Sequence, residues 1–221
     1  MDLRFASRTD IGRHRLHNED RCLIVPERSL FGVADGVGGL PAGETASALA
    51  CDTLARTLEA ADAFAPSTPA DRLVRAVHRA HEAVVATGWQ ISPATGIATT
   101  LTVGQFADGH VHIAHVGDSR CYAWLDGTFC QVTQDHSEMH ALTRCVGQRQ
   151  ALTIDVIDRP VAAGDRFLFC TDGLSGEVSP EELAVLTRHD AEPEEVLKKL
   201  VGIALARGGL DNISGVLVYV G

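Results

Sequence analysis

The sequence has none of the marks of a secreted, disulfide-rich or membrane-spanning protein. Its six cysteines lie far apart and form no Cys-x-x-Cys pair. Scattered cysteines with apolar neighbours are typical of buried free thiols in a reducing compartment. No run reaches the ~18 apolar residues of a membrane span. The charged residues between Asp2 and Arg13 leave no room for the apolar core of a signal peptide, so we expect a cytoplasmic protein.

Basic residues and internal repeats are also scarce. The chain has 19 Lys and Arg against 29 Asp and Glu, a formal net charge of −10. This balance argues against nucleic acid or an anionic membrane as a partner, because both attract clustered basic side chains. A negative net charge is expected of a protein that binds cations. It is equally expected of a protein whose acidic surface serves only to keep it soluble. No segment repeats with a period of ~20 to 50 residues, and none has the composition of a linker, so we expect residues 1–221 to form a single domain.

The sequence does contain short apolar runs, some with the period of a β-strand and others with the period of an α-helix. Runs of period two predict strands at residues 3–8, 21–25, 30–34, 98–106, 110–115, 120–125, 129–132, 152–157, 166–170 and 213–220. Helical periods and capping residues predict helices at 44–61, from Thr68 onward, from Ser179 onward and at 192–206. Strands in antiparallel clusters and helices in pairs predict an α+β fold in which helices cover two sheets.

Acidic residues stand where several of these strands meet a turn. The five segments are Asn18-Glu19-Asp20, Asp35-Gly36, Gly117-Asp118, Thr171-Asp172-Gly173 and Asp211-Asn212. Each by itself is an ordinary turn, but an Asp at a strand end also presents a hard oxygen ligand on a rigid scaffold. Carboxylates gathered in this way repel one another unless a positive charge lies between them. Together the segments therefore suggest divalent cations and chemistry on a phosphate.

A cation for the phosphate itself is available near the first acidic segment. Arg15 lies three residues before Asn18, and a guanidinium can bind two phosphate oxygens at once. Arg8, Arg13 and Arg21 lie nearby, so an ordinary surface role for Arg15 stays open.

Two other patterns imitate familiar sites. Cys22 and Arg28 have the spacing of a cysteine-phosphatase loop, but the residues between them form a strand that ends in Pro26, which has no N–H to offer a phosphate. His136 and His140 lie one helical turn apart, as zinc ligands can, but no third ligand is evident. We favour neither a cysteine phosphatase nor a zinc site.

Eight motifs, taken in their order along the chain, resemble those of the metal-dependent type 2C (PPM family) serine/threonine protein phosphatases. They are Gly12-x-x-Arg15-x-x-Asn18-Glu19-Asp20, Asp35-Gly36-Val37-Gly38-Gly39, Ala98-Thr99-Thr100-Leu101, Val116-Gly117-Asp118-Ser119-Arg120, Asp135-His136-Ser137, Leu142-Thr143-Arg144, Phe169-Cys170-Thr171-Asp172-Gly173-Leu174 and Asp211-Asn212-Ile213-Ser214. The resemblance covers nearly the whole chain and is closest to compact bacterial members. It implies a four-layer αββα sandwich, with two antiparallel β-sheets flanked by helix pairs and a metal site at one edge between the sheets.

The resemblance also implies a role for each acidic segment. Two Mn²⁺ or Mg²⁺ ions would share a water that attacks the phosphate, and bacterial members have a third, weaker ion position. The implied assignments are Asp35 as the bridge between two ions, the Gly36 carbonyl on one of them, Asp172 and Asp211 for one ion, Glu19 and Asp20 for the other through waters, Asp118 with Asp172 for the third position, Arg15 for the phosphate, and Asn18 and Asn212 beside the ligands.

The implied activity is hydrolysis of phosphoserine and phosphothreonine in proteins, by an activated water and without a phosphoenzyme. Such a protein would act on phosphoproteins in signalling, opposite a Ser/Thr kinase, with no nucleic-acid or membrane partner. The alternative is a pseudo-phosphatase, which binds phosphoproteins with little or no cleavage. A metal-dependent nuclease would also use carboxylates, but the acidic charge and the lack of a basic groove disfavour it.

Two departures from the family pattern bear on mechanism. Many eukaryotic relatives carry a His after the Asp-Gly pair, where this chain has Val37; a metal-bound water, which we favour, or His17 would then protonate the leaving group. Bacterial relatives usually carry a long flap insert where this chain has only the four residues between Ser137 and Leu142. We expect a more open groove and a third ion that is held less firmly.

Overall fold

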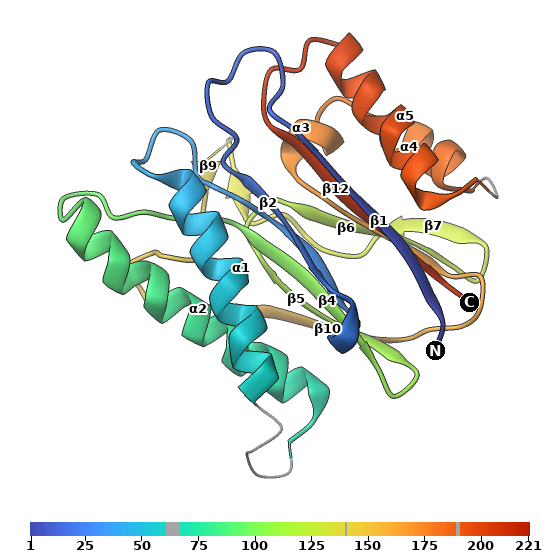
Figure 1. The fold of residues 1–221 in the computed structure, drawn as a ribbon, viewed down its shortest axis with the longest axis horizontal. Coiled ribbons are helices and arrows are strands. Elements are labelled where there is room, and N and C mark those ends of the chain that lie inside the picture. Colours follow the sequence, from blue (N-terminus) through green and yellow to red (C-terminus); the bar gives the residue numbers. More distant parts are fainter. Residues whose placement is uncertain (61–66, 140, 189–190) are drawn as a thin grey trace.

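The computed structural model describes residues 1–60, 67–139, 141–188 and 191–221. Two five-stranded antiparallel sheets stack face to face, and helices cover the outer face of each sheet (Figure 1). The predicted α+β fold with four αββα layers is confirmed. No helix in the described ranges is long and apolar enough to cross a membrane.

One sheet contains both ends of the chain and has the strand order β1-β12-β11-β6-β7. Its strands are β1 (Leu3–Asp10), β6 (Arg120–Leu125), β7 (Thr128–Gln131), β11 (Arg166–Cys170) and β12 (Ile213–Val220). All eight residues of β12 are buried, because the strand lies between β1 and β11 and between the other sheet and the helices. This position explains why its sequence is apolar without alternation.

The other sheet has the order β10-β5-β4-β3-β2. Its strands are β2 (Asp20–Val25), β3 (Leu30–Asp35), β4 (Leu101–Ala107), β5 (His110–Val116) and β10 (Asp155–Pro160), and a 3-10 helix, η1 (Pro26–Arg28), joins β2 to β3. A separate two-stranded hairpin, β8 (Ser137–Glu138) and β9 (Ala141–Leu142), follows β7 in the chain. The isolated bridge of Thr99 to Gly36 and Val146 replaces the predicted start of a strand at residue 98.

Each sheet packs against its own helices. The helices are α1 (Gly43–Ala60) and α2 (Pro69–Ile91) on the second sheet and α3 (Asp172–Ser175), α4 (Pro180–Arg188) and α5 (Pro193–Ala206) on the first. α2 begins where predicted: Asp71 N–H donates to Thr68 Oγ1 at 3.1 Å, and Thr68 N–H donates to the Asp71 carboxylate at 3.2 Å. Its predicted apolar stripe, Leu73, Val77, Ala80 and Val84, is buried.

One predicted strand is misplaced, and one helical spacing does not belong to a helix. The strand predicted at 152–157 is β10, Asp155–Pro160, and it can contain Pro160 because an edge strand leaves some N–H groups unpaired. The helical spacing of His136 and His140 does not correspond to a helix, because β8 follows His136 directly; His140 lies outside the described residues. All six cysteines are free, as expected, but only Cys51, Cys121 and Cys170 are buried. Cys22 and Cys145 are partly buried, and Cys130 is exposed on the edge strand β7.

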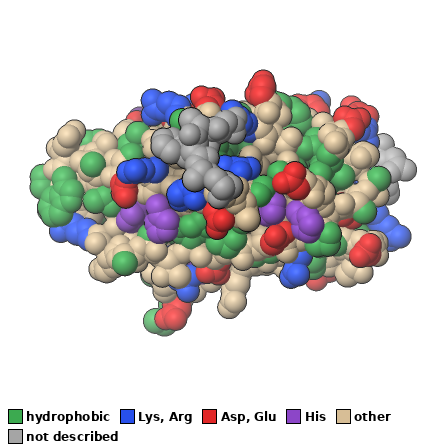
Figure 2. All heavy atoms as spheres, turned by 90° about the horizontal axis from the view of Figure 1, so that it is seen from below, with side chains coloured by type: hydrophobic (Ala, Val, Ile, Leu, Met, Phe, Trp, Pro, Cys, Tyr) green, Lys and Arg blue, Asp and Glu red, His purple; other side chains and the backbone are tan. Residues whose placement is uncertain are grey.

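Charges of both signs share the surface. On the face drawn in Figure 2, Lys and Arg side chains are interspersed with Asp, Glu and His. The net charge of −10 is therefore not gathered into one patch on this face.

Candidate metal centre

The strand ends bring four aspartates to one end of the sandwich. Asp20 begins β2 and Asp35 ends β3, and the two are partners in the antiparallel register. Asp172 begins α3, two residues after the end of β11, and Asp211 precedes β12 by two residues. Because β11 ends beside the start of β12, these aspartates lie at the same edge. Residues that are up to 191 positions apart in the sequence therefore form one cluster.

Asp20 is the most enclosed member of the cluster. The residue is 7% exposed, and its Oδ2 accepts a hydrogen bond from Thr171 Oγ1 at 2.9 Å. Its Oδ1 is buried and has no hydrogen-bond partner in the described part of the chain. Burial, reinforced by the charges of Asp172 and Asp211, raises the pKa of Asp20 to about 7. A buried carboxylate oxygen without a donor destabilises the protein unless a cation or water reaches it.

Asp35 and Asp172 show the same need for positive charge. Burial, then the charges of Asp20, Asp172 and Asp211, raises the pKa of Asp35 well above its usual value. Burial and then the charge of Asp211 raise the pKa of Asp172. Like charges at this spacing oppose ionisation of their neighbours, so a cation between them would relieve every member at once.

Arg15 supplies one positive charge at the edge of the cluster. Its Nη2 donates to Asp211 Oδ2 at 2.6 Å, and 38% of its side chain remains exposed. Asn212 fixes the loop that carries Arg15, because its Nδ2 donates to the carbonyls of Ile11 at 2.9 Å and His17 at 3.0 Å. The guanidinium is thus held beside the carboxylates with one side open to solvent.

Asn18 and Asn212 lie beside the predicted ligands, as expected from the sequence. The Glu19 N–H donates to Asn212 Oδ1 at 2.8 Å, and the Asp20 N–H donates to Asn18 Oδ1 at 3.1 Å. The two amides therefore fix the backbone of Glu19 and Asp20, the segment predicted to hold an ion through waters.

Gly36 and Glu19 meet the first turn of α1. The Gly36 N–H donates to the Glu19 carbonyl at 3.1 Å. A Cβ on Gly36 would lie 2.4 Å from the Gly43 carbonyl carbon, and a Cβ on Gly43 would lie 2.8 Å from the Glu19 carboxyl carbon. Only glycines allow this approach, which explains why the Asp-Gly turn packs so closely on α1. Burial raises the pKa of Glu19, and a hydrogen bond from the Gly43 N–H opposes that rise.

Asp118 lies to one side of the cluster, nearest to Asp172. It follows Gly117 in the turn between β5 and β6, and its side chain is half-buried. Burial, then the charge of Asp172, raises the pKa of Asp118 to about 6. The charge of Asp172 therefore acts on Asp118, its partner in the predicted third ion position.

Hydroxyl groups support these carboxylates, and the sequence had indicated no role for them. Thr100 Oγ1 accepts the Asp35 N–H at 2.9 Å and lies 2.7 Å from Ser119 Oγ. Thr99 Oγ1 donates to the Asp35 carbonyl at 2.8 Å. The only feature of the sequence that pointed to these hydroxyl groups was the motif Ala98-Thr99-Thr100-Leu101. A Thr in an apolar segment does not by itself indicate which group its hydroxyl will bind.

The donors of this cluster fit Mg²⁺ or Mn²⁺. They are carboxylate and carbonyl oxygens, the hard ligands that these ions prefer. Among the described residues, no three His, Cys, Asp or Glu side chains converge closely enough to enclose an ion by themselves. Ions of this class keep several waters, and the unpartnered Asp20 Oδ1 is an acceptor for such a shell. The residues therefore fit hydrated divalent cations rather than a closed structural site.

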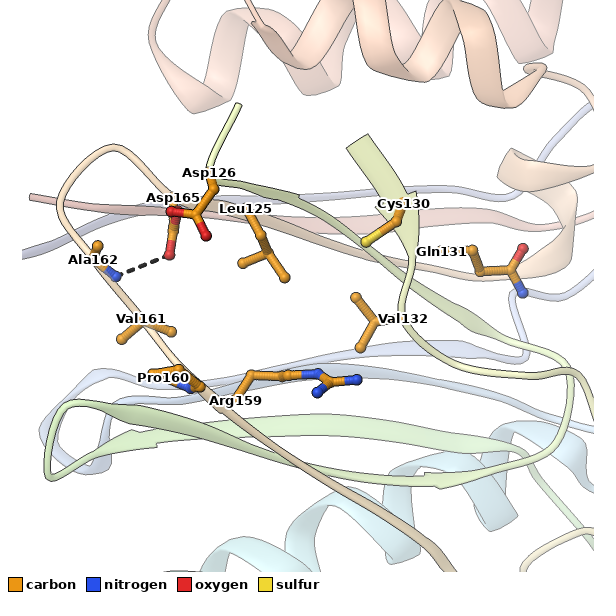
Figure 3. Close-up of a pocket in the computed structure, with 10 residues that line it drawn as sticks. All are labelled: Leu125, Asp126, Cys130, Gln131, Val132, Arg159, Pro160, Val161, Ala162 and Asp165. Carbon is orange, nitrogen blue, oxygen red and sulfur yellow. Dashed lines mark hydrogen bonds between the residues drawn. The ribbon is translucent and has the colours of Figure 1, made fainter. Parts of the chain in front are cut away.

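A hollow at another edge of the sandwich is separate from this cluster. It has a volume of about 520 Å³ and lies among β6, β7, β10 and the segment after β10. Figure 3 shows Leu125 and Val132 pointing into it, with Arg159 along one side. None of the acidic site residues lines it, so its volume has no bearing on the metal centre.

Comparisons with known proteins agree with this geometry. Residues 12–202 match the family described as protein phosphatase 2C. The serine/threonine protein phosphatase PstP of Mycobacterium tuberculosis (strain H37Rv) is 33% identical over 238 residues, which cover 99% of this chain and 45% of PstP. The serine/threonine phosphatase stp of Listeria welshimeri is 29% identical over 235 residues, covering 96% of this chain and 93% of stp. This chain thus spans less than half of PstP but nearly all of stp.

Solved structures show the same likeness in three dimensions. The catalytic domain of PstP in complex with two manganese ions has a TM-score of 0.87 and 33% identity, and the match covers 99% of both chains. PppA, described as a key regulatory component of the T6SS in Pseudomonas aeruginosa, has a TM-score of 0.86 and 30% identity, covering 98% of this chain and 97% of PppA. The sequence match, the shared sandwich and the cluster of aspartates at its edge lead to one conclusion: this chain belongs to the protein phosphatase 2C family.

Proposed function

We propose that this protein is a Mn²⁺- or Mg²⁺-dependent phosphatase that hydrolyses phosphoserine and phosphothreonine in proteins. The observation that carries the proposal is the buried, unpartnered Oδ1 of Asp20 within a cluster of four mutually repelling aspartates. Added positive charge would relieve the repulsion within that cluster, and Arg15 beside it offers a binding group for phosphate. Relatives that carry the name serine/threonine phosphatase support the substrate class.

The acidic residues would divide the work of holding the ions. When bound, divalent cations supply a water of lowered pKa and neutralise charge on the phosphate. Asp35, at the end of β3 opposite Asp20, and the carbonyl of the next residue, Gly36, would contribute ligands. The remaining holders would be Asp172 and Asp211 for one ion, Glu19 and Asp20 for the other through waters, and Asp118 with Asp172 for a third.

Arg15 binds and orients the substrate phosphate. Asp211 holds its guanidinium at one nitrogen, which leaves the exposed side of the planar group for phosphate oxygens. Gly38 lies against this guanidinium, because a Cβ there would be 3.3 Å from Arg15 Nη1. A small residue at that position keeps the approach to Arg15 open.

Nucleophilic catalysis by cysteine does not fit the structure. Burial raises the pKa of Cys22 to about 12, and its Sγ packs against the carbonyl oxygens of Arg8 and Gly215 at 3.8 and 3.9 Å. A thiol in this environment is neither ionised nor accessible to a phosphate. Hydrolysis by water, without a phosphoenzyme, is the route that the remaining groups support.

The pseudo-phosphatase alternative is not favoured, because every acidic position that the family pattern requires is present. We further propose that residues 1–221 act as one catalytic domain, in cytoplasmic signalling and opposite a Ser/Thr kinase. Support for this finer statement comes from the regulatory role in the description of PppA.

The test combines metal binding and turnover. The purified protein should bind Mn²⁺ in a calorimetric titration, hydrolyse phosphoserine and phosphothreonine peptides with Mn²⁺, and lose that activity in a chelator. Binding of Mn²⁺ without hydrolysis of either peptide would favour the pseudo-phosphatase instead. Absence of Mn²⁺ binding would overturn the metal assignment.

A further inference from the structure

His136 forms two hydrogen bonds with the turn that contains Asp118. Its backbone N–H donates to the Gly117 carbonyl at 2.8 Å, and its Nδ1 accepts the Gly117 N–H at 3.2 Å. Both polar groups of Gly117 therefore bind one residue, which lies 19 positions away in the sequence. The His136 residue is 6% exposed, so water does not compete for these bonds.

A carboxylate fixes the orientation of the His136 ring. Because Nδ1 accepts a hydrogen bond, the neutral ring carries its proton on Nε2, and Asp155 Oδ2 accepts that proton at 3.0 Å. Arg144 Nη1 donates to the other oxygen, Asp155 Oδ1, at 2.8 Å. The Gly117 N–H therefore sets the tautomer, and Asp155 together with Arg144, whose Nη1 also lies 3.1 Å from Nε2, sets the direction of the ring.

Asp155 also anchors the β8–β9 hairpin, which occupies the position where bacterial relatives usually have a long flap. His136 directly precedes β8, and Arg144 follows β9 by two residues. The carboxylate of Asp155 therefore binds the residues at both ends of the hairpin. The Thr143 N–H donates to the His136 carbonyl at 2.9 Å and closes the hairpin at its base. The short insert is therefore anchored to β10 at the base.

Gly117 connects this anchor to the metal centre. Its φ is +112°, and a Cβ there would lie 2.6 Å from the Thr100 side chain. Thr100 in turn accepts the Asp35 N–H, and Asp118 is the next residue after Gly117. Any shift of Gly117 would move Asp118 relative to both Asp35 and Asp172.

We propose that His136 is a positioning residue, which through Gly117 holds Asp118 where it can share an ion with Asp172. The inference rests on the proposed function, since it deepens the account of the same metal centre. On this proposal the third ion would be held more firmly than the short insert alone predicts, because the Arg144–Asp155–His136 contacts fix the turn that carries Asp118.

Two substitutions separate the proposed role from mere stability. In His136→Asn, the amide oxygen can occupy the place of Nδ1 and still accept the Gly117 N–H; in His136→Gln, the longer amide reaches towards Asp155 instead. We expect His136→Gln to raise the Mn²⁺ concentration for half-maximal activity roughly 10- to 100-fold, as losses of groups that orient metal ligands do. Turnover at saturating Mn²⁺ should change much less, and His136→Asn should stay close to the wild type.

His81→Gln is the matched control. His81 Nδ1 accepts the Gly147 N–H at 3.1 Å, so the variant breaks the same kind of bond away from Asp118. It should leave the Mn²⁺ dependence unchanged even if it lowers the melting temperature. Equal shifts in the Mn²⁺ dependence of His136→Asn, His136→Gln and His81→Gln, or no shift in any of them, would overturn the proposal.

A double-mutant cycle tests whether His136 acts through Asp118. Asp118→Asn should weaken Mn²⁺ activation, and adding His136→Gln to it should change little further, because both remove the same contribution. Shifts that multiply would show independent roles and overturn the proposal. Calorimetric titration of the weakest Mn²⁺ site in the same four proteins gives the readout without catalysis, so a failure of phosphatase activity would not be mistaken for a failure of this inference.

Discussion

Asp20 and Asp35 face each other across the first hairpin of the chain, the first residue of β2 opposite the last residue of β3. Directly opposite like charges destabilise an antiparallel pair, and burial of both makes the repulsion larger. The protein thus keeps a locally unfavourable pair at the centre of its metal site. Removing one of these two negative charges should therefore raise the stability of the metal-free protein. The same change should lower the activity of the protein with metal bound.

Asp35→Asn should show both effects. With Mn²⁺, we expect turnover to fall by at least about 100-fold, because a ligand should matter no less than the groups that orient it. In a chelator, the variant should melt at a higher temperature than the wild type, by roughly 2–4 °C for each kcal/mol of repulsion removed. Turnover assays and thermal melts of one preparation measure the two changes. Asp52→Asn, on the outer part of α1, is the control, and a near-normal rate for Asp35→Asn would refute the assignment.

Mn²⁺ affinity should rise with pH. Asp20 has a pKa of about 7 and Asp118 a pKa of about 6 before any ion binds, and a bound cation requires both carboxylates to be ionised. Below pH 6 protons therefore compete with Mn²⁺, and binding should tighten as the pH passes from about 6 to about 7. Calorimetry in two buffers of different ionisation enthalpy would detect the protons released. Affinity and proton release that do not vary across this range would contradict the prediction.

The sequence predicted the fold well where each local signal agreed with the final packing. Thr68 caps α2 as expected and forms a capping box with Asp71, and β12 has the continuous apolar pattern of a strand buried on both faces. Prediction failed where the signal was short or depended on distant partners. Two-residue strands such as β8 have no periodicity to detect, so the sequence predicted no element at residues 137–142.

The site could be predicted only in part for the same reason. Asp35-Gly36 and Asp172-Gly173 are visible as motifs, because a carboxylate before a glycine is a local pattern. The pairing of Arg15 with Asp211 spans 196 positions, and the contact of Asp155 with His136 depends on an edge strand whose bounds the sequence misplaced. Residue type was therefore predictable, whereas the choice of partner required the three-dimensional arrangement.

His115 should make stability depend on pH independently of the metal ligands. The residue is 0% exposed, and burial, then the charge of His136, lowers the pKa of His115 from 6.5 to about 4. Between these values the unfolded chain binds a proton that the folded protein does not, so stability falls as the pH falls from about 6.5 to about 4. The full contribution is roughly 3 kcal/mol. It should appear as a pH-dependent difference in urea unfolding between the wild type and His115→Gln, and a constant difference would exclude it.

Arg15→Lys tests whether the guanidinium itself matters. Lysine keeps the positive charge but cannot present two parallel N–H groups to a phosphate. We expect kcat/KM for a phosphopeptide to fall roughly 100-fold, while Mn²⁺ binding measured by calorimetry stays close to that of the wild type. Arg75→Lys, at an exposed site on α2, should have no effect on either quantity. An equal loss in both variants would remove Arg15 from the phosphate site.

Gly36→Ala should disturb the metal centre through the backbone alone. The added methyl group would lie 2.4 Å from the carbonyl carbon of Gly43 in the first turn of α1, and neither backbone segment can turn aside as a flexible side chain could. We expect a loss of about 1–3 kcal/mol in the free energy of unfolding, together with weaker Mn²⁺ binding, since the Gly36 carbonyl must move. Gly202→Ala is the matched control, because nothing lies within 4 Å of its Cβ position in α5, and alanine there should stabilise the helix by about 0.5–1 kcal/mol. Urea unfolding and Mn²⁺ calorimetry of both variants decide the point: a stable Gly36→Ala protein with unchanged Mn²⁺ affinity would show that the close approach of the Asp-Gly turn to α1 is not required.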